Sequence, residues 1–497
     1  MAHIISGDDI YGPGTWIDSE ALPVPDDARR LFKVLAEATP EFTNDLRCFR
    51  NAAQTACDRK LRDQGRWHLV STAWVSGRRS GISETIGIDP SQECSSHDEA
   101  YQLIAEQVRK FGAHELEMMH LVQGLCGSIC YTPAGWRQTR MSKDLSKHPL
   151  INYKLQAHVV PTPAIPLPVS AEKRPLAGIK VVELVRIIAG PVIGTTLAAL
   201  VADVTRVNCG RLPDFNVSHD YPLNLATVLF TWWSLVSLQL TLNAGVRTID
   251  VDLAKDDEVK HLLKLNKDAD VFIQGYRPGV IARKGLSLDD LLGIAGKRGK
   301  GIVYVEENCY GPDGPMAERP GWQQIADAAS GCSHVTGRSL GYKDGRCVLP
   351  ALPAPDMLTG LVGAIGTMMA IRDRARQGGS YHVFASLMAA AALHLSLEVG
   401  PYSPEVVQGY NQKFGWDETG PELFVLELLD VVLKSWGRAM PKYSGEDSPY
   451  MSTLKGDWGE FQMLKPVIQL SDVNPSPYFS SAPEPNCYRS SGAIAWR

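Results

Sequence analysis

Residues 175–207 read PLAGIKVVELVRIIAGPVIGTTLAALVADVTRV, and this stretch determines the predicted fold. Ile179–Val185 is a run of apolar and β-branched residues, as expected of a buried strand. The small and apolar residues of Val192–Leu200 predict a closely packed helix, and Asp203–Asn208 predicts a second strand. A strand, a helix and a strand in this order form a βαβ unit, whose two strands lie parallel in one sheet.

The same alternation continues downstream. Further strands are predicted at Thr248–Leu253, Asp270–Tyr276 and Gly301–Glu306, and helices at Lys255–Asp268 and Pro278–Gly285. Repeated units of this kind build an α/β fold with a doubly wound, Rossmann-like parallel sheet. Ligands bind such sheets at the carboxyl ends of the strands, so the functional site is expected there.

The turn after the first predicted strand is Arg186–Pro191, RIIAGP. It lacks the GxGxxG pattern, which argues against a dinucleotide cofactor. A glycine-containing turn that opens a helix can still hold a phosphate, and Arg186 would supply a charged partner. The simpler interpretation is that these residues form an ordinary connecting turn without a ligand.

Asp356 directly precedes a long uncharged run within Leu349–Phe384, LPALPAPDMLTGLVGAIGTMMAIRDRARQGGSYHVF. Apolar residues recur at helical spacing over Met357–Ile371, so Asp356 precedes a predicted helix. The commoner interpretation of such a residue is a helix N-cap. The alternative is a nucleophile or base, which the helix N-terminus would keep ionised. Four small residues would let this helix pack closely on a neighbour: Gly360, Gly363, Ala364 and Gly366.

Length, charge and cysteine pattern exclude several classes of protein. The chain has 497 residues and a net charge of −5, so nucleic acid is not an expected partner. Cys126 and Cys130 lie four residues apart with no second pair, so no metal site is expected. The beginning MAHIISGDDIYGPG lacks signal-peptide features, so we expect a cytoplasmic protein, with an organellar location left open. The uncharged stretch of residues 221–246 is long enough for a membrane span, but its polar residues favour a buried segment.

Four parts of the chain are predicted. Residues 1–160 form a mostly helical N-terminal region, with amphipathic patterns at 26–42, 51–65 and 95–125. Residues 161–175 carry five prolines and form a linker. Residues 176–400 form the sheet domain, and 401–497 form a C-terminal return segment and tail.

Several of these stretches, in this order, resemble the family III CoA-transferases of the CaiB/BaiF type. That family includes formyl-CoA transferase, carnitine CoA-transferase and the α-methylacyl-CoA racemases. The resemblance covers residues 175–387 through the first stretch, DVFIQGYRPGVIARKGL (270–286), GIVYVEENCYGPDGPMAERPGW (301–322), DAASGCSHVTG (327–337) and the Asp356 stretch. Residues 132–150 are similar to the end of the family's small domain, which makes the N-terminal region a degenerate first repeat with a small-domain-like segment. Residues 459–472 are similar to the segment that returns to the large domain.

The resemblance implies a transferase that moves CoA between an acyl-CoA and a carboxylic acid. Asp356 would be the nucleophile, forming first a mixed anhydride and then an enzyme thioester. CoA or acyl-CoA would be a substrate, with no permanently bound cofactor. The protein would be a homodimer, possibly of the family's interlocked kind, without nucleic acid or membrane partners. By the same matching, the CoA contacts would be Arg186, Ile188, Ala189, Val251, Gly275, Tyr276 and Arg283.

The chain also departs from the family pattern. Trp322-Gln323 replaces the histidine and aspartate of the racemases, so the second proton carrier of a two-base racemase is missing. Ile188 replaces a glutamine of formyl-CoA transferase, and Val201 replaces a usual glycine. Two alternatives therefore stay open: a racemase or isomerase on the same fold, and an inactive CoA-binding homologue.

Overall fold

The computed structural model describes residues 86–89, 97–157, 161–170, 173–209, 241–342, 345–396, 399, 401–417, 419–420, 423, 425–441, 449–456, 459–466, 470 and 479. The helices predicted at 26–42 and 51–65 lie outside these residues, as does the uncharged stretch up to residue 240. The helical pattern at 95–125 is confirmed by α6 (His97–Val108) and α7 (Ala113–Val122).

The core of the described chain is a seven-stranded sheet with the order β1-β7-β6-β5-β2-β3-β4. Its strands are β1 (Asn152–Gln156), β2 (Lys180–Leu184), β3 (Asp203–Asn208), β4 (Arg247–Asp250), β5 (Val271–Gln274), β6 (Val303–Asn308) and β7 (Ser380–Ser386). The strands from β2 to β7 are parallel, and β1 pairs antiparallel with β7 at the edge. The chain runs outward from β2 to β4 and then returns to β5 on the other side of β2. The ends of β2 and β5 therefore form the switch point of a Rossmann-type order, where such sheets bind ligands.

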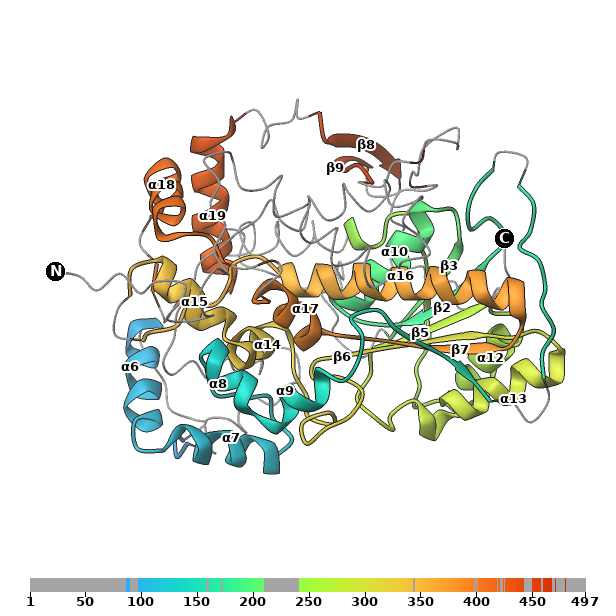
Figure 1. Cartoon of the computed structure of the whole chain (residues 1–497), viewed down its shortest axis with the longest axis horizontal. Helices are drawn as coiled ribbons and strands as arrows, with labels where there is room; N and C mark the ends of the chain where they lie inside the picture. Colours follow the sequence, from blue (N-terminus) through green and yellow to red (C-terminus); the bar gives the residue numbers. More distant parts are fainter. Residues whose placement is uncertain are drawn as a thin grey trace.

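Helices cover both faces of this sheet, which confirms the predicted doubly wound α/β fold (Figure 1). On one face α10 (Ala189–Ala199) and α16 (Ala354–Gln377) share a core with alternate strand residues such as Val181. On the other face α12 (Asp256–Asn266) and α13 (Leu288–Arg298) share a second core with residues such as Val182. Adjacent strand residues thus enter opposite cores, as the alternation of a pleated strand requires.

The remaining described elements lie outside the sheet and the helices that cover its two faces. They are α8 (Pro133–Gln138), α9 (Arg140–Leu145), η2 (Ala282–Lys284), α14 (Gln323–Ser330), α15 (Cys332–Ser339), α17 (Leu387–His394), α18 (Pro404–Phe414), α19 (Val425–Ala439), β8 (Met451–Gly456) and β9 (Gly459–Leu464). The helix predicted at Pro278–Gly285 is only the 3-10 turn η2, because Gly279 and Gly285 have φ of 76° and 74°. Positive φ breaks a right-handed helix.

Small residues bring α16 close to its neighbours, as predicted. A Cβ at Gly360 would lie 2.7 Å from the carbonyl oxygen of Ala189, and one at Gly363 would lie 2.7 Å from Cδ1 of Ile193. Of the helices in the described ranges, α16 alone is long and apolar enough to cross a membrane, yet 78% of its apolar window is buried inside the protein. It has the burial of a core helix.

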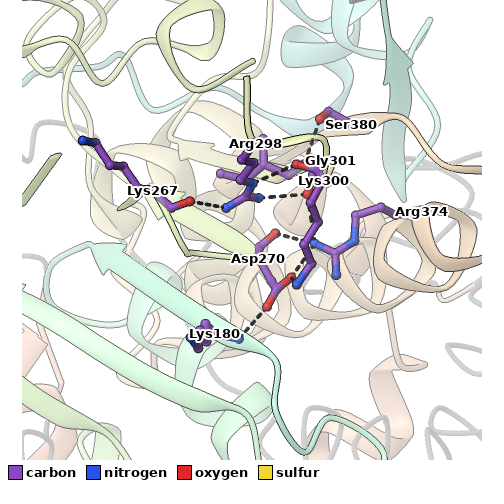
Figure 2. A network of polar contacts seen from close by, with 9 residues as sticks. Lys180, Lys267, Asp270, Arg298, Lys300, Gly301, Arg374 and Ser380 are labelled. Atoms are coloured by element: carbon purple, nitrogen blue, oxygen red, sulfur yellow. Dashed lines mark hydrogen bonds and ion pairs between the residues drawn. The ribbon is translucent and has the colours of Figure 1, made fainter. Parts of the chain in front are cut away.

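The far end of α16 is tied to the amino ends of the strands by a buried ionic network (Figure 2). Asp270 precedes β5, is 1% exposed, and pairs with Arg374 at 2.9 Å and Lys300 at 2.6 Å. Its second oxygen accepts a hydrogen bond of 3.1 Å from the backbone N–H of Lys180. Burial acts to raise the pKa of Asp270, but the charges of Arg374 and Lys300 outweigh it and the pKa is lowered.

The turn between α10 and β3 explains why the family usually has glycine where this chain has Val201. Val201 has φ of 72°, in the left-handed region that branched side chains avoid. This conformation costs about 1–3 kcal/mol for a residue other than glycine.

We expect Val201→Gly to stabilise the fold by about 1 kcal/mol, because relief of the strain outweighs the extra entropy of the unfolded chain. Val201→Ala keeps a Cβ and should gain less. Urea denaturation midpoints measure both changes. A lower midpoint for Val201→Gly than for the natural protein would contradict this account of the strain.

We expect Gly360→Ala to destabilise the protein by about 1–3 kcal/mol, because the new methyl group has no space between α16 and α10. The matched control is Gly409→Ala in α18, where a Cβ would meet nothing within 4 Å. Alanine favours helix by up to about 1 kcal/mol over glycine, so the control should stabilise. Equal effects of the two substitutions on the urea midpoint would argue against the close packing.

Candidate active site

Asp356 lies in the first turn of α16, at the carboxyl edge of the sheet. The adjacent Met357 packs in a cluster with Ile188, which follows β2. The Thr359 hydroxyl lies 3.3 Å from the carbonyl oxygen of Ser386 at the end of β7. Asp356 is 9% exposed, so its carboxyl group is almost removed from solvent. The switch point and this carboxyl group therefore lie in the same part of the fold.

The prediction that Asp356 is the helix N-cap is wrong. Pro353 is the N-cap, and Asp356 is the third residue of the helix. Proline is favourable in the first helical turn because its missing N–H needs no partner there, so the helix begins before the aspartate. The backbone N–H of Asp356 donates instead to Oε1 of Gln323 at 3.2 Å. The carboxyl group is thus left free of a capping role.

Burial raises the pKa of Asp356 to about 7. The sequence predicts the opposite direction, because a helix N-terminus favours a negative charge. Desolvation outweighs that effect here, since the apolar surroundings penalise the charged form. At neutral pH this carboxyl group exchanges readily between its acid form and its nucleophilic carboxylate.

Gln323 links the start of α16 to α14. Its Nε2 donates to Oδ2 of Asp327 at 3.2 Å and to the carbonyl oxygen of Leu352 at 3.1 Å. Asp327 is fully buried, and burial raises its pKa well above the usual range, against the hydrogen bond from Gln323 and with help from the charge of Asp356. Burial therefore favours the protonated form of Asp327 beside the site.

A second titratable group, Glu307 near the end of β6, was missed by sequence reasoning. Burial, with the negative charge of Asp356 as a second cause, raises the pKa of Glu307 to about 8. Its Oε1 lies directly over Gly275, where any Cβ would overlap it. The available signal was a pair of glutamates, Glu306-Glu307, ending an otherwise apolar strand.

The predicted CoA contacts are only partly brought together. Arg186, Ile188 and Ala189 follow β2, and Gly275 and Tyr276 follow the neighbouring β5. By contrast, the other two lie apart. Val251 follows β4, two strands away from β2, and is 2% exposed in the core beneath α12 and α13, while Arg283 is exposed in η2. Contact of these residues with CoA stays a prediction.

The turn that carries the first three of these residues is strained. Ile187 has φ of 67°, which is unfavourable for a β-branched side chain. Strain of this kind costs about 1–3 kcal/mol and is concentrated at functional sites. The turn therefore keeps an unfavourable backbone conformation at the place where a Rossmann-type sheet receives its ligand.

The N-terminal segment packs against the loop after β6 and against α14. Trp136 and Met141 share a buried cluster with Tyr310. Glu117 pairs with Arg319 at 3.3 Å, and both side chains are largely buried. The predicted small-domain-like segment thus covers one side of the candidate site.

In the parts of the chain that the structure describes, no group of three or more His, Cys, Asp or Glu side chains is arranged to hold a metal ion. The six cysteines in those parts are free thiols. Burial, with nearby acidic groups, raises the pKa of Cys309 well above its usual range, so this thiol is no nucleophile.

Comparison with known proteins places the chain in a family. Residues 176–419 match the model described as CoA-transferase family III. An acyl-CoA transferase of Gibberella moniliformis is 44% identical over 404 residues, which cover 81% of this chain and 68% of the relative. The chain belongs to CoA-transferase family III.

Other matches of this family III chain are shorter or more distant. An acetyl-coenzyme A transferase of Hypoxylon pulicicidum is 39% identical over 218 residues, which cover 44% of this chain and only 33% of the relative. A CaiB/BaiF family protein from Brucella suis matches in structure at 23% identity and a TM-score of 0.38, over 59% of this chain and 66% of the other.

The buried acids make stability depend on pH. Glu307, Asp327 and Asp356 all have raised pKa values in the folded protein. The folded state therefore holds protons that the unfolded chain has already lost, so the free energy of unfolding falls as pH rises through these folded-state values.

We expect the urea midpoint to fall between pH of about 6.5 and 8.5. Asp327→Asn should make this fall smaller, because the amide copies the neutral acid and cannot ionise. The buried His120 has a lowered pKa and affects stability only at lower pH. A midpoint in the variant with the same pH dependence as the natural protein would contradict a neutral buried Asp327.

Proposed function

We propose that this family III CoA-transferase moves CoA between an acyl-CoA and a carboxylic acid, with Asp356 as the nucleophile. The observation that carries the proposal is the buried carboxyl group of Asp356, held at the carboxyl edge of the sheet with a pKa of about 7. A nucleophile with this pKa is ionised in useful amount at neutral pH, yet is weakly solvated and reactive.

In the first step, a carboxylate oxygen of Asp356 attacks the thioester carbon of the acyl-CoA. The carbon–sulfur bond breaks, and CoA leaves as a thiolate while a mixed anhydride forms on Asp356. The thiolate then attacks the aspartyl carbonyl carbon, which releases the acyl group as a carboxylate and leaves CoA as an enzyme thioester. The acceptor acid resolves this thioester by the reverse sequence.

Burial serves this chemistry in a second way. Both covalent intermediates react with water, so a site that admits little solvent favours transfer over hydrolysis. The low exposure of Asp356 supports that role. Packing of the N-terminal segment beside α14 supports it further.

CoA would lie across the ends of β2 and β5. The strained turn with Arg186, Ile188 and Ala189 would hold one part of the nucleotide, and Gly275 and Tyr276 would face the pantetheine. The exposed guanidinium of Arg283 would pair with a phosphate. The printed names of the relatives, acyl-CoA and acetyl-coenzyme A transferases, support an acyl-CoA donor. A cytoplasmic homodimer is part of the same proposal.

A racemase or isomerase is the second candidate. Such an enzyme needs a second proton carrier, which Trp322-Gln323 cannot supply but Glu307, a titratable group near Asp356, could. Deuterium incorporation at the α-carbon of an acyl-CoA, without exchange of CoA, would favour that reaction. An inactive homologue would bind CoA and catalyse neither exchange nor deuterium incorporation.

We expect Asp356→Asn to lower exchange of labelled CoA into acyl-CoA by more than about 1,000-fold, because the amide cannot act as the nucleophile. Hydroxylamine should trap an Asp356 hydroxamate in the natural protein incubated with acyl-CoA, and none in the variant. Mass spectrometry of the Asp356 peptide measures the adduct. The control is Glu306→Gln, because the side chain of Glu306 lies on the face of β6 that packs against α12 and α13, away from α16. Equal exchange by Asp356→Asn and the natural protein would remove Asp356 from the mechanism.

A further inference from the structure

The alternation of β6 gives its last two acidic residues opposite surroundings. Glu306 lies on the face of α12 and α13, where it accepts a hydrogen bond of 2.6 Å from Gln274 and lies 2.7 Å from Nε2 of His382. Glu307 points to the face of α10 and α16. Its carboxyl group makes no hydrogen bond or ion pair with any described residue. A partly buried acid without such partners does not favour stability, so a role other than stability is to be sought.

Gly275 makes the position of Glu307 possible. A Cβ at residue 275 would overlap Oε1 of Glu307 and lie 3.0 Å from its Cδ. The carboxyl group therefore occupies the space beside the backbone that follows β5, at the switch point of the sheet. Asp356 is near enough for its negative charge to act on Glu307. Glu307 thus lies at the ligand-binding edge, close enough to the nucleophile for their charges to interact.

We propose that Glu307 is a second catalytic residue, which gives a proton to the CoA sulfur as the thioester breaks and recovers it when that sulfur attacks again. This inference rests on the proposed function, since it concerns the leaving group of the reaction that Asp356 begins.

Protons and electron pairs are conserved in both steps, cleavage of the thioester and return of the sulfur. When the Asp356 oxygen bonds to the thioester carbon, the carbon–sulfur bond breaks and its electron pair goes to sulfur. The proton of neutral Glu307 moves to that sulfur, so that the departing thiolate is held as a CoA thiol beside the mixed anhydride and a Glu307 carboxylate. In the second step the carboxylate removes the thiol proton while sulfur attacks the aspartyl carbonyl carbon. The acyl carboxylate departs, and Glu307 is again neutral.

The acidity of Glu307 suits this exchange. Its pKa of about 8 lies close to the value of about 8.5 for a cysteine thiol, so a proton can move between Glu307 and a thiol in either direction at little cost. Among the described groups, Asp356 from α16 is the one whose charge acts on Glu307, whereas Cys309 in the following loop is itself acted on by Glu307. From α14, Asp327 and Gln323 reach Asp356 rather than Glu307. Gly275 of the β5 end brings no charge.

The two acids together predict a bell-shaped dependence of kcat/KM on pH. Activity rises through pH of about 7 as Asp356 ionises and falls above about 8 as Glu307 loses its proton. Because the two carboxyl groups interact, these apparent values belong to the pair.

The test measures CoA exchange from pH 5.5 to 9.5 in the natural protein and in Glu307→Gln, Glu307→Asp and Glu306→Gln. We expect Glu307→Gln to lose about 100-fold or more in kcat, with a small change in KM for acyl-CoA, and to lose the alkaline decline. Glu307→Asp retains an acid and should retain that decline at reduced kcat. The matched control Glu306→Gln should keep both sides of the profile.

Two results would overturn the inference. One is a Glu307→Gln variant with kcat within about twofold of the natural protein, and the other is an unchanged alkaline decline in that variant. If Glu307→Gln does not fold, loss of the decline in folded Glu307→Asp would equally count against it. Failure of the proposed function is distinguished by Asp356→Asn, which would then exchange CoA normally whatever the Glu307 variants do.

Discussion

The close contact of α16 with α10 and β7 is the constraint on which the site depends. Gly360 and Gly363 let the two helices approach until backbone and side chain touch, and a larger residue at either position would separate them. Because α16 begins at the carboxyl edge of the sheet, its first-turn carboxyl group is buried with it. The reactivity of Asp356 thus follows from packing along the whole helix.

Burial and the helix dipole act on Asp356 in opposite directions, and magnitudes decide between them. A helix N-terminus favours a carboxylate by about 0.3–1 kcal/mol, and by about 2 kcal/mol at most. The rise of the pKa from 3.8 to about 7 corresponds to about 4 kcal/mol in the other direction. Desolvation therefore sets the charge state, and the dipole only reduces its effect. Burial thus brings the pKa of Asp356 to about 7 without any charged partner.

The sheet could be predicted from sequence because each of its central strands is an apolar run between turn signals, and Asp203–Asn208 is matched to the residue. The local sequence pattern was less informative where contacts between residues far apart in the chain determine the structure. β1 becomes a strand by pairing with β7, more than 200 residues later, within a region that the sequence predicts to be mostly helical. The cap assignment of Asp356 failed because the prolines before it begin the helix earlier. Glu307 could not be recognised because its meaning depends on Gly275 and Asp356, which only the fold brings near it.

The departures from the family pattern have different physical consequences. Val201 adds backbone strain at a turn far from the nucleophile, and so affects stability rather than chemistry. Gln323 stands where racemases have an aspartate, yet its amide can donate and accept at once, which joins Asp327, Leu352 and Asp356 without adding charge. A charged residue at position 323 would shift the pKa of Asp356 away from about 7. Asp356 has the uncharged amide of Gln323 on one side and a neutral acid, Glu307, on the other, so burial alone sets its pKa. This arrangement gives two neighbouring carboxyl groups pKa values in the range of physiological pH.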